Sequence, residues 1–369
     1  MLGFYFHVPF CQSKCPYCDF YSRSASPAVM DAYVQALLSS LSPWTEKLRG
    51  REISTVYFGG GTPNLLGADR LGTILQGVRE RFSLSPGAEI TLEANPTHVD
   101  QAFFEQVRSA GFNRLSMGLQ SANPEELRFL GRTHSPQDVI RAVENARAAG
   151  FENISLDLML GLPGGSKERL GESIAFAAGL AVEHISSYIL KVEPGTPFAA
   201  RHIAVPDDDQ TSDQYLFVVE ELAKRGYAQY EISNFSRPDR ESRHNLLYWR
   251  GEEYLGFGPA AHSFFGGRRF YYPRDLEEFL QGNAPVDDGP GGDFGEFAIL
   301  NLRLTRGLRR EDCLARFGPQ GEEEFHLLLE NAKKCPSTLL RREEDRLSFT
   351  PEGFLVSNAL LVRLLGEEL

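Results

Sequence analysis

Long apolar runs and cysteines are both scarce in this 369-residue sequence, and each absence excludes a class of protein. The longest uninterrupted apolar stretch, residues 174–182, is too short for a helix that spans a bilayer. Five cysteines, in a chain long enough to bury a large core, do not indicate a disulfide framework. The first residues also lack the basic segment and apolar core of a signal peptide. We therefore expect a globular cytoplasmic protein with reduced thiols and no transmembrane segment.

An excess of positive charge is missing as well. The chain has 38 lysines and arginines against 50 acidic residues, which gives a formal net charge of −12 at pH 7. This balance argues against a broad surface for nucleic acid or anionic membranes. Residues 294–369 contain 11 basic and 13 acidic residues, so this part does not have the charge of a DNA-binding module. We expect no nucleic-acid partner.

Strand-like runs alternate with amphipathic helical runs over the first two thirds of the chain. The helical runs have recognisable ends, as where Ser135 and Pro136 open a pattern that stops at Gly150. Six strands, each followed by a helix, predict an α/β fold with a parallel sheet. Six units rather than eight predict an open, partial (β/α)6 TIM-like barrel. The predicted strands are residues 3–8, 53–58, 89–94, 114–118, 154–158 and 184–190.

The alternation stops after residue 230. Residues 231–283 are predicted to be irregular with short strands, and residues 284–293 have the Pro, Gly and Asp content of a linker. Three helical segments, a hairpin and a last helix over 351–365 then predict a small winged-helix-like domain. We expect three parts: a barrel over 1–235, an irregular connecting segment and linker over 236–293, and a C-terminal helical domain over 294–369.

Three of the five cysteines lie close together. Cys11, Cys15 and Cys18 have C-x3-C-x2-C spacing directly after the first predicted strand. Thiolates are soft ligands that suit zinc or iron–sulfur clusters. Structural zinc needs four ligands, and the only nearby addition is His7 inside the strand, so zinc is the second alternative. A 4Fe–4S cluster on three thiolates would keep one iron open for a small molecule.

Polar and glycine-rich motifs follow the other predicted strands. In a parallel barrel the carboxyl ends of the strands meet at one face, so these residues should surround the cysteines. Glycines allow close approach of a ligand, and a carboxylate within an apolar run, such as Asp157, needs a partner or a ligand. Taken singly, each motif also has an ordinary structural explanation. The residues concerned are Gly60, Gly61, Thr62, Glu93, Gln120, Arg132 and Asp157.

The cysteine spacing resembles the signature of the radical S-adenosylmethionine (SAM) superfamily, including the aromatic Tyr17 before the third cysteine. The resemblance implies a 4Fe–4S cluster on Cys11, Cys15 and Cys18. It also implies that SAM chelates the open iron, and that an electron donor is needed if SAM is cleaved to a 5′-deoxyadenosyl radical.

Further motifs narrow the resemblance to the oxygen-independent coproporphyrinogen III oxidase family. These are the segment 5–11, Gly-Gly-Gly-Thr-Pro at 59–63, Leu-Ser-Met-Gly-Leu-Gln-Ser at 115–121, residues 157–163 and Tyr-Glu-Ile-Ser-Asn-Phe at 230–235. The family resemblance implies SAM contacts beyond the cysteines. They are Tyr5, Tyr17, Gly60, Gly61, Thr62, Glu93, Gln120, Arg132 and Asp157.

Two departures instead resemble the HemW-like haem chaperone branch of this family. Phe20 stands where the oxidase has a further cysteine, and the cysteine motif begins at residue 11 without the oxidase's preceding extension. The branch also has an H-N-x-x-Y-W motif, which starts here at His244. This resemblance implies binding of haem and its transfer to haem-requiring acceptor proteins. The alternative function is SAM-dependent oxidative decarboxylation of coproporphyrinogen III, so the presence of enzymatic activity is left open.

Histidines and the remaining cysteines complete the candidates. Neutral imidazole is a common axial ligand of haem iron, which makes His244 the haem candidate and His262 a second one. His7 lies beside the cysteine motif and is expected to pack there. Cys313 and Cys335 are expected to be structural thiols.

Overall fold

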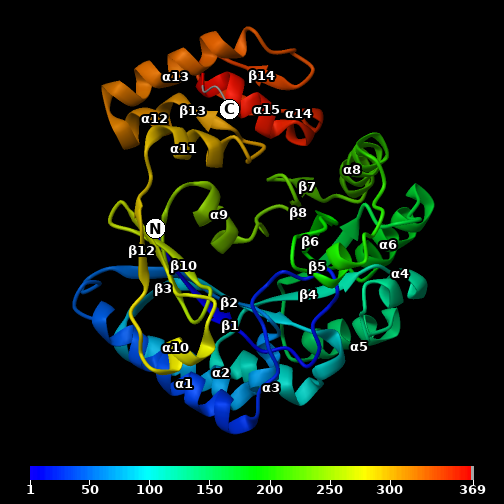
Figure 1. The fold of residues 1–369 in the computed structure, drawn as a ribbon, viewed down its shortest axis with the longest axis vertical. Helices are drawn as coiled ribbons and strands as arrows, with labels where there is room; N and C mark the ends of the chain where they lie inside the picture. Colours follow the sequence, from blue (N-terminus) through cyan, green and yellow to red (C-terminus); the bar gives the residue numbers. More distant parts are fainter. Residues whose placement is uncertain (367–369) are drawn as a thin grey trace.

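A computed structural model describes residues 1–366, and one large sheet dominates it. Six parallel strands are neighbours in chain order, and the sheet does not close on itself, which confirms the partial barrel. Helices cover its outer face in an arc (Figure 1). The six strands are β1 (Leu2–Val8), β2 (Glu52–Gly60), β3 (Ser83–Ala94), β4 (Arg114–Gln120), β5 (Ile154–Leu160) and β6 (His184–Ile189).

The outer helices begin and end where the capping residues predict. Ser135 caps α5 in a reciprocal capping box with Asp138, and Gly111 ends α3 with a left-handed φ of 110°. These helices are α1 (Pro27–Leu41), α2 (Ala68–Arg81), α3 (Gln101–Ala110), α4 (Pro124–Phe129), α5 (Pro136–Ala148), α6 (Lys167–Gly179), α7 (Pro197–Ala200) and α8 (Asp208–Lys224). Short 3-10 turns η1 (Ser42–Trp44), η2 (Pro63–Leu66) and η3 (Pro96–His98) connect some of them.

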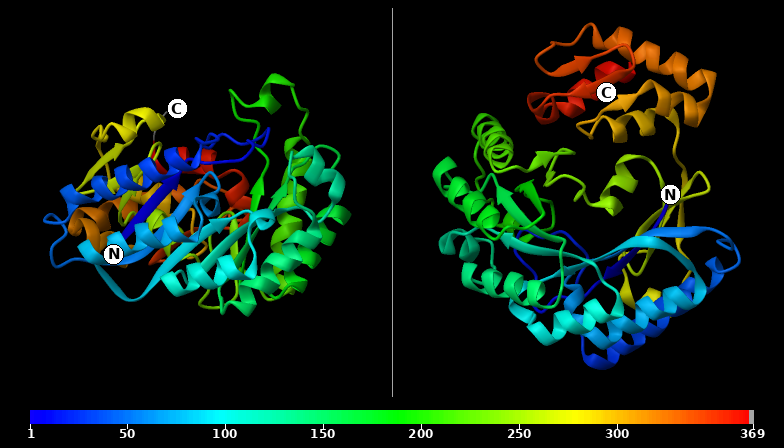
Figure 2. Two further views of the ribbon diagram at one scale, coloured as in Figure 1. Left: turned by 90° about the horizontal axis from the view of Figure 1, so that it is seen from below. Right: turned by 180° about the vertical axis from the view of Figure 1, so that it is seen from behind.

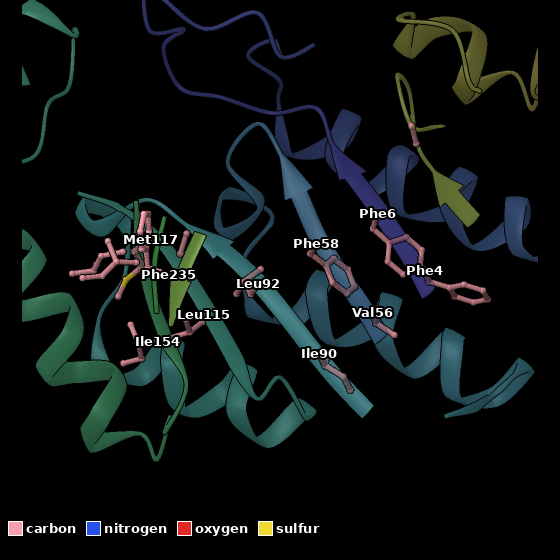
Figure 3. Close-up of a cluster of buried hydrophobic side chains, with 14 of the residues drawn as sticks. Phe4, Phe6, Val56, Phe58, Ile90, Leu92, Leu115, Met117, Ile154 and Phe235 are labelled. Atoms are coloured by element: carbon pink, nitrogen blue, oxygen red, sulfur yellow. The ribbon is translucent and has the colours of Figure 1, made fainter. Parts of the chain in front are cut away.

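Apolar side chains from alternate strand positions form the core between the sheet and the helices (Figure 3). Phe4, Phe6 and Phe58 are fully buried there, and the rings of Phe6 and Phe58 lie 4.8 Å apart. Because side chains alternate across a strand, the residues between them point to the inside of the barrel. Tyr5 and His7 of β1 and Gly59 of β2 occupy these inward positions.

The sheet continues beyond the six strands at both edges. β9 (Glu253–Phe257) pairs in parallel with β1, and the antiparallel strands β10 (His262–Phe265), β11 (Arg268–Tyr271) and β12 (Val286–Pro290) follow it. At the other edge β8 (Asn234–Ser236) pairs antiparallel with β6, and β7 (Ala228–Gln229) pairs with β8.

The middle of the chain is thus more regular than the sequence pattern indicates. Two helices, α9 (Arg243–Trp249) and α10 (Leu276–Leu280), lie within the segment predicted to be irregular, and β12 lies within the predicted linker. These elements are short, and pairing with β11 rather than local propensity holds β12 in an extended conformation. The division at residues 235 and 293 stays a prediction.

The C-terminal part forms its own helical layer, which faces the inner side of the barrel across α9 (Figure 2). It contains α11 (Phe294–Asn301), α12 (Arg310–Phe317), α13 (Pro319–Ala332), α14 (Pro351–Leu355) and α15 (Ser357–Leu365). Strands β13 (Leu308–Arg309), β14 (Leu340–Arg342) and β15 (Arg346–Phe349) form a small sheet in the order β13-β15-β14. The predicted last helix is divided at Val356, between α14 and α15.

Main-chain hydrogen bonds join this part to the barrel. The N–H of Thr305 donates to the carbonyl of Tyr230 at 3.0 Å, and the N–H of Ile232 donates to the carbonyl of Arg303 at 3.2 Å. The Tyr-Glu-Ile motif therefore connects the two parts. No helix among residues 1–366 combines the length and hydropathy that a membrane span requires.

Candidate cluster and cofactor site

The three clustered cysteines lie on one loop that leaves the carboxyl end of β1. The loop is closed at its base, where the N–H of Cys11 donates to the carbonyl of Arg23 at 3.0 Å and the N–H of Arg23 donates to the carbonyl of Pro9 at 2.9 Å. Within the loop, the N–H of Cys18 donates to the carbonyl of Cys15 at 3.1 Å. All three thiols are free and half-buried. A closed loop with three free thiols is a suitable donor set for an iron–sulfur cluster.

Two polar groups accompany these sulfur atoms. The Cys11 Sγ lies 3.3 Å from the Thr62 Oγ1, and the Arg132 Nη1 lies 3.7 Å from the Cys15 Sγ. Burial raises the pKa of the Cys18 thiol. Within residues 1–366 no group of three or more His, Cys, Asp or Glu side chains is gathered around one point in the manner of a single-ion site.

The glycine run at the carboxyl end of β2 lies against the base of this loop. A side chain at Gly61 would place its Cβ 2.6 Å from the carbonyl oxygen of Phe10 and 2.9 Å from that of Val8, both of which belong to the backbone. At Gly60, φ is 109° and a Cβ would lie 2.7 Å from the His7 ring. Only glycine fits both positions, so this turn packs directly against the chain that leaves β1.

Glu93 faces the same turn from the end of β3. Its carboxylate accepts hydrogen bonds from the Tyr57 hydroxyl at 2.8 Å and from the N–H of Gly60 at 3.2 Å. Burial, reinforced by the nearby Asp157, raises the pKa of Glu93 to about 7, although these two hydrogen bonds oppose the shift. Tyr5 lies beside this group, with its ring 6.1 Å from that of Tyr57. Burial raises the pKa of Tyr5 as well.

Gln120 and Arg132 converge over Gly118 on β4. A Cβ at Gly118 would lie 2.5 Å from the Gln120 Nε2 and 3.0 Å from the Arg132 Nη2. The Gln120 backbone is left-handed, with φ of 65°, where it leaves the strand. Asp157 lies on the neighbouring strand β5, opposite Gly118, and accepts from the Ser116 hydroxyl at 3.4 Å. Burial raises the pKa of Asp157.

Tyr17 belongs to the cysteine loop and lies beside α7. Its ring packs 6.3 Å from that of Phe198, at the edge of a small apolar cluster that includes Leu130 and Met159. Thus the structure brings the predicted residues together in connected groups at the mouth: the thiols with Thr62 and Arg132, and the glycine turn with Glu93.

His244 is placed differently. Its side chain is only 1% exposed, and both ring nitrogens have partners: Nδ1 lies 2.7 Å from the Thr55 Oγ1 and Nε2 lies 2.7 Å from the Tyr248 hydroxyl. A Cβ at Gly3 of β1 would lie 2.5 Å from Leu247 of the same helix, so α9 packs directly on the inner side of β1 and β2. Burial, together with the nearby Arg114, lowers the pKa of His244 to about 3.

The other histidine and cysteine candidates lie in three different environments. His7 packs beside the cysteine loop, with Nε2 2.9 Å from the Tyr21 carbonyl oxygen, while His262 is exposed and stacks on Tyr271. Cys313 and Cys335 are buried in the C-terminal part.

Two residues in the barrel interior were not singled out from the sequence. Tyr57 orients Glu93, and its position two residues before Gly59 could have shown that it faces inward. Arg114 is only 2% exposed, and its Nε has no hydrogen-bond partner within residues 1–366. The sequence around Arg114, a single arginine at the start of β4, does not indicate that this side chain is buried.

Comparisons with known proteins agree with this geometry. The family model described as the radical SAM superfamily matches residues 5–177. Heme chaperone HemW of Escherichia coli is 42% identical over 99% of this chain and 98% of its own length. Heme chaperone HemW of Mycobacterium tuberculosis is 40% identical over 99% and 95%, and that of Bacillus subtilis is 33% identical over 100% of both.

Among solved structures, coproporphyrinogen III oxidase (HemN) from Escherichia coli has the same fold. Its TM-score is 0.84 at 24% identity, and the match covers 98% of this chain and 89% of the oxidase chain. This likeness confirms the α/β radical SAM fold. With its full-length similarity to several HemW proteins, the chain belongs to the HemW family within the radical SAM superfamily.

Proposed function

We propose that this protein is a haem chaperone, which binds haem and transfers it to acceptor proteins that require haem. The observation that carries this proposal is the 33–42% identity to proteins named heme chaperone HemW over essentially their full length. The exposed Phe20, in the position where the related oxidase has a further cysteine, supports the same choice.

We assign the 4Fe–4S cluster to Cys11, Cys15 and Cys18, with SAM on the fourth iron. When bound, the cluster supplies the electron that cleavage of SAM requires. Arg132, beside Cys15, would pair with the carboxylate of SAM, and main-chain carbonyls of the glycine turn would accept from its ammonium group. We assign ribose contacts to Glu93. The remaining SAM contacts are Tyr5, Tyr17, Gly60, Gly61, Thr62, Gln120 and Asp157.

We retain His244 as the candidate axial ligand of haem. Iron coordination by its Nε2 requires that the hydrogen bond to the Tyr248 hydroxyl be broken, so haem binding at this residue must be accompanied by a local rearrangement of α9.

A second candidate function is the oxidative decarboxylation of coproporphyrinogen III. It is supported by the fold shared with HemN and by the gathering of the SAM-site residues at the barrel mouth. Both functions would take place in the cytoplasm, where the five free cysteines would stay reduced, and SAM cleavage would need an electron donor as a partner.

Two assays on one anaerobically reconstituted preparation test the proposal. We expect haem titration to give a saturable Soret change with a stoichiometry of about one, and haem to pass to an apo-haem protein added afterwards. Coproporphyrinogen III supplied with SAM and a reductant should remain unconverted. Multiple turnovers of coproporphyrinogen III without haem transfer would overturn the chaperone proposal in favour of the oxidase.

A further inference from the structure

A pocket lies away from the cofactor site, at the junction between the barrel and the C-terminal part. Its volume is about 440 Å³, within the range of small-molecule sites. The carboxyl end of α9 supplies Arg250, and the C-terminal part supplies Phe297, Arg306 and Arg316. Three arginines line this pocket, although the chain has a net charge of −12.

The acidic residues in this pocket are already paired. Asp312 lies 3.0 Å from the Arg306 Nη2, and Glu252 accepts from the Met1 amino group at 2.9 Å. No carboxylate within residues 1–366 forms an ion pair with Arg250 or Arg316. The pocket therefore contains two positive charges that the described protein does not neutralise.

Buried donors without acceptors lie at the same place. The Nε atoms of Arg250 and Arg306 are both buried and have no hydrogen-bond partner within residues 1–366, and the buried Asp312 Oδ2 has only its ion pair with Arg306. Burial and the nearby charge of Arg250 lower the pKa of Arg306, although Asp312 acts in the opposite direction. Since unpaired buried donors and crowded like charges both cost free energy, an anion in this pocket would stabilise it.

Arg316 is held in position for such an anion. Its guanidinium lies 4.9 Å from the ring centre of Phe297, and its Nη1 donates to the Arg250 carbonyl oxygen at 3.5 Å. Gly251 between them has φ of 62°, and a Cβ there would lie 3.3 Å from the same Nη1. The chain thus brings an arginine from α12 against the end of α9.

We propose that this pocket binds the two propionate carboxylates of haem, through Arg250 and Arg316. The inference rests on the proposed haem function and adds a place for the acidic edge of the ligand. Guanidinium groups present paired N–H donors that match a carboxylate. The two propionates would therefore neutralise the two unpaired positive charges, one on Arg250 and one on Arg316. The buried Phe297 ring packs under the Arg316 guanidinium and helps to hold it at the pocket. Arg250 directly follows the H-N-x-x-Y-W motif, so the pocket adjoins the helix that carries His244.

Haem and its dimethyl ester, in which both propionates are esterified, distinguish this site from haem binding in general. We expect the wild-type protein to bind haem more tightly than the diester. Arg250→Gln and Arg316→Gln should each weaken haem binding about tenfold, as for loss of a charged hydrogen bond, and should leave the diester unaffected. Arg316→Lys, which keeps the charge, should retain part of the preference.

Arg341→Gln is the matched control, because Arg341 is an exposed arginine of the same C-terminal part outside the pocket. Each variant serves as its own folding control, since a general loss of structure would weaken both ligands equally. If wild type binds haem and diester equally, or if the two glutamine variants keep the preference, the pocket is not the propionate site while the haem function stands. If wild type binds neither ligand, the haem function itself fails and the pocket assignment fails with it.

Discussion

The imidazole of His244 stacks on the phenol ring of Tyr57, with ring centres 5.1 Å apart and planes inclined by 25°. The hydroxyl of the same tyrosine donates to Glu93 at 2.8 Å. The helix that carries the H-N-x-x-Y-W motif is therefore in contact with a side chain that orients the candidate SAM site. A disturbance at α9 can reach the cofactor site through Tyr57 and also through Tyr5, whose ring stacks 6.3 Å from that of His244.

Tyr248→Phe tests the haem ligand. This variant removes the hydroxyl that occupies the Nε2 of His244, so we expect haem affinity to rise about fivefold, the equivalent of one hydrogen bond. Haem titration followed by the Soret band measures the change. Tyr254→Phe is the control, because its ring packs on Tyr248 and its hydroxyl contacts Arg269 instead. An unchanged haem complex in His244→Ala would remove His244 as the axial ligand.

SAM binding should depend on pH through Glu93. Its pKa is raised to about 7, and the ionised carboxylate is the better acceptor for ribose hydroxyls. We therefore expect SAM affinity to rise as the pH increases through this value and to level off above it, in calorimetric titrations of the cluster-loaded protein. Glu93→Gln, which cannot ionise, should bind SAM more weakly with little pH dependence over this range. A steep pH dependence that survives in Glu93→Gln would assign the titration to another group.

Gly61→Ala should disrupt the base of the cysteine loop. The new Cβ would meet the backbone carbonyls of Val8 and Phe10, and neither can move without displacing the chain that leads to Cys11. We expect a loss of about 1–3 kcal/mol of stability, as for other overpacked sites, and a lower iron and sulfide content after reconstitution. Gly179→Ala is the control, since a Cβ at this helical position meets nothing within 4 Å. Equal cluster content in the two variants would show that the glycine turn does not support the loop.

Serine substitutions of the cysteines should divide them into two classes. Cys11→Ser, Cys15→Ser and Cys18→Ser each remove one proposed ligand, so iron and sulfide content should fall to near zero. Cys313→Ser changes a buried thiol far along the chain and should retain a full cluster. Elemental analysis of anaerobic preparations gives the result. Stoichiometric zinc without sulfide in the wild-type protein would contradict the cluster assignment.

The parallel sheet and the position of the clustered cysteines could be predicted because both depend on local spacing. The helix around Ser135 was predicted from its capping residues, and the strand that contains Asp157 from its apolar run; both are present. The cysteine spacing likewise located the loop. Each of these signals comes from residues that are neighbours in the sequence.

The features that the sequence did not predict depend on contacts between segments that are far apart in the chain. α9 is only seven residues long, and its N–H groups at Arg243 and His244 donate to Glu89 on β3, far away in the chain. β12 is extended because β11 pairs with it, although its residues have little strand propensity. The arginine pocket unites residues from α9 and α12, and no spacing rule relates such positions.

The pairing of Tyr230 and Ile232 with Thr305 and Arg303 has a consequence for how the molecule unfolds. Truncation before residue 294 would remove the partners of these backbone groups and uncover Glu231, which is only 1% exposed. A barrel produced without the C-terminal part would therefore have unpaired main-chain groups at Tyr230 and Ile232, near one edge of its sheet. Because each part stabilises the other, the intact chain should unfold in a single cooperative thermal transition.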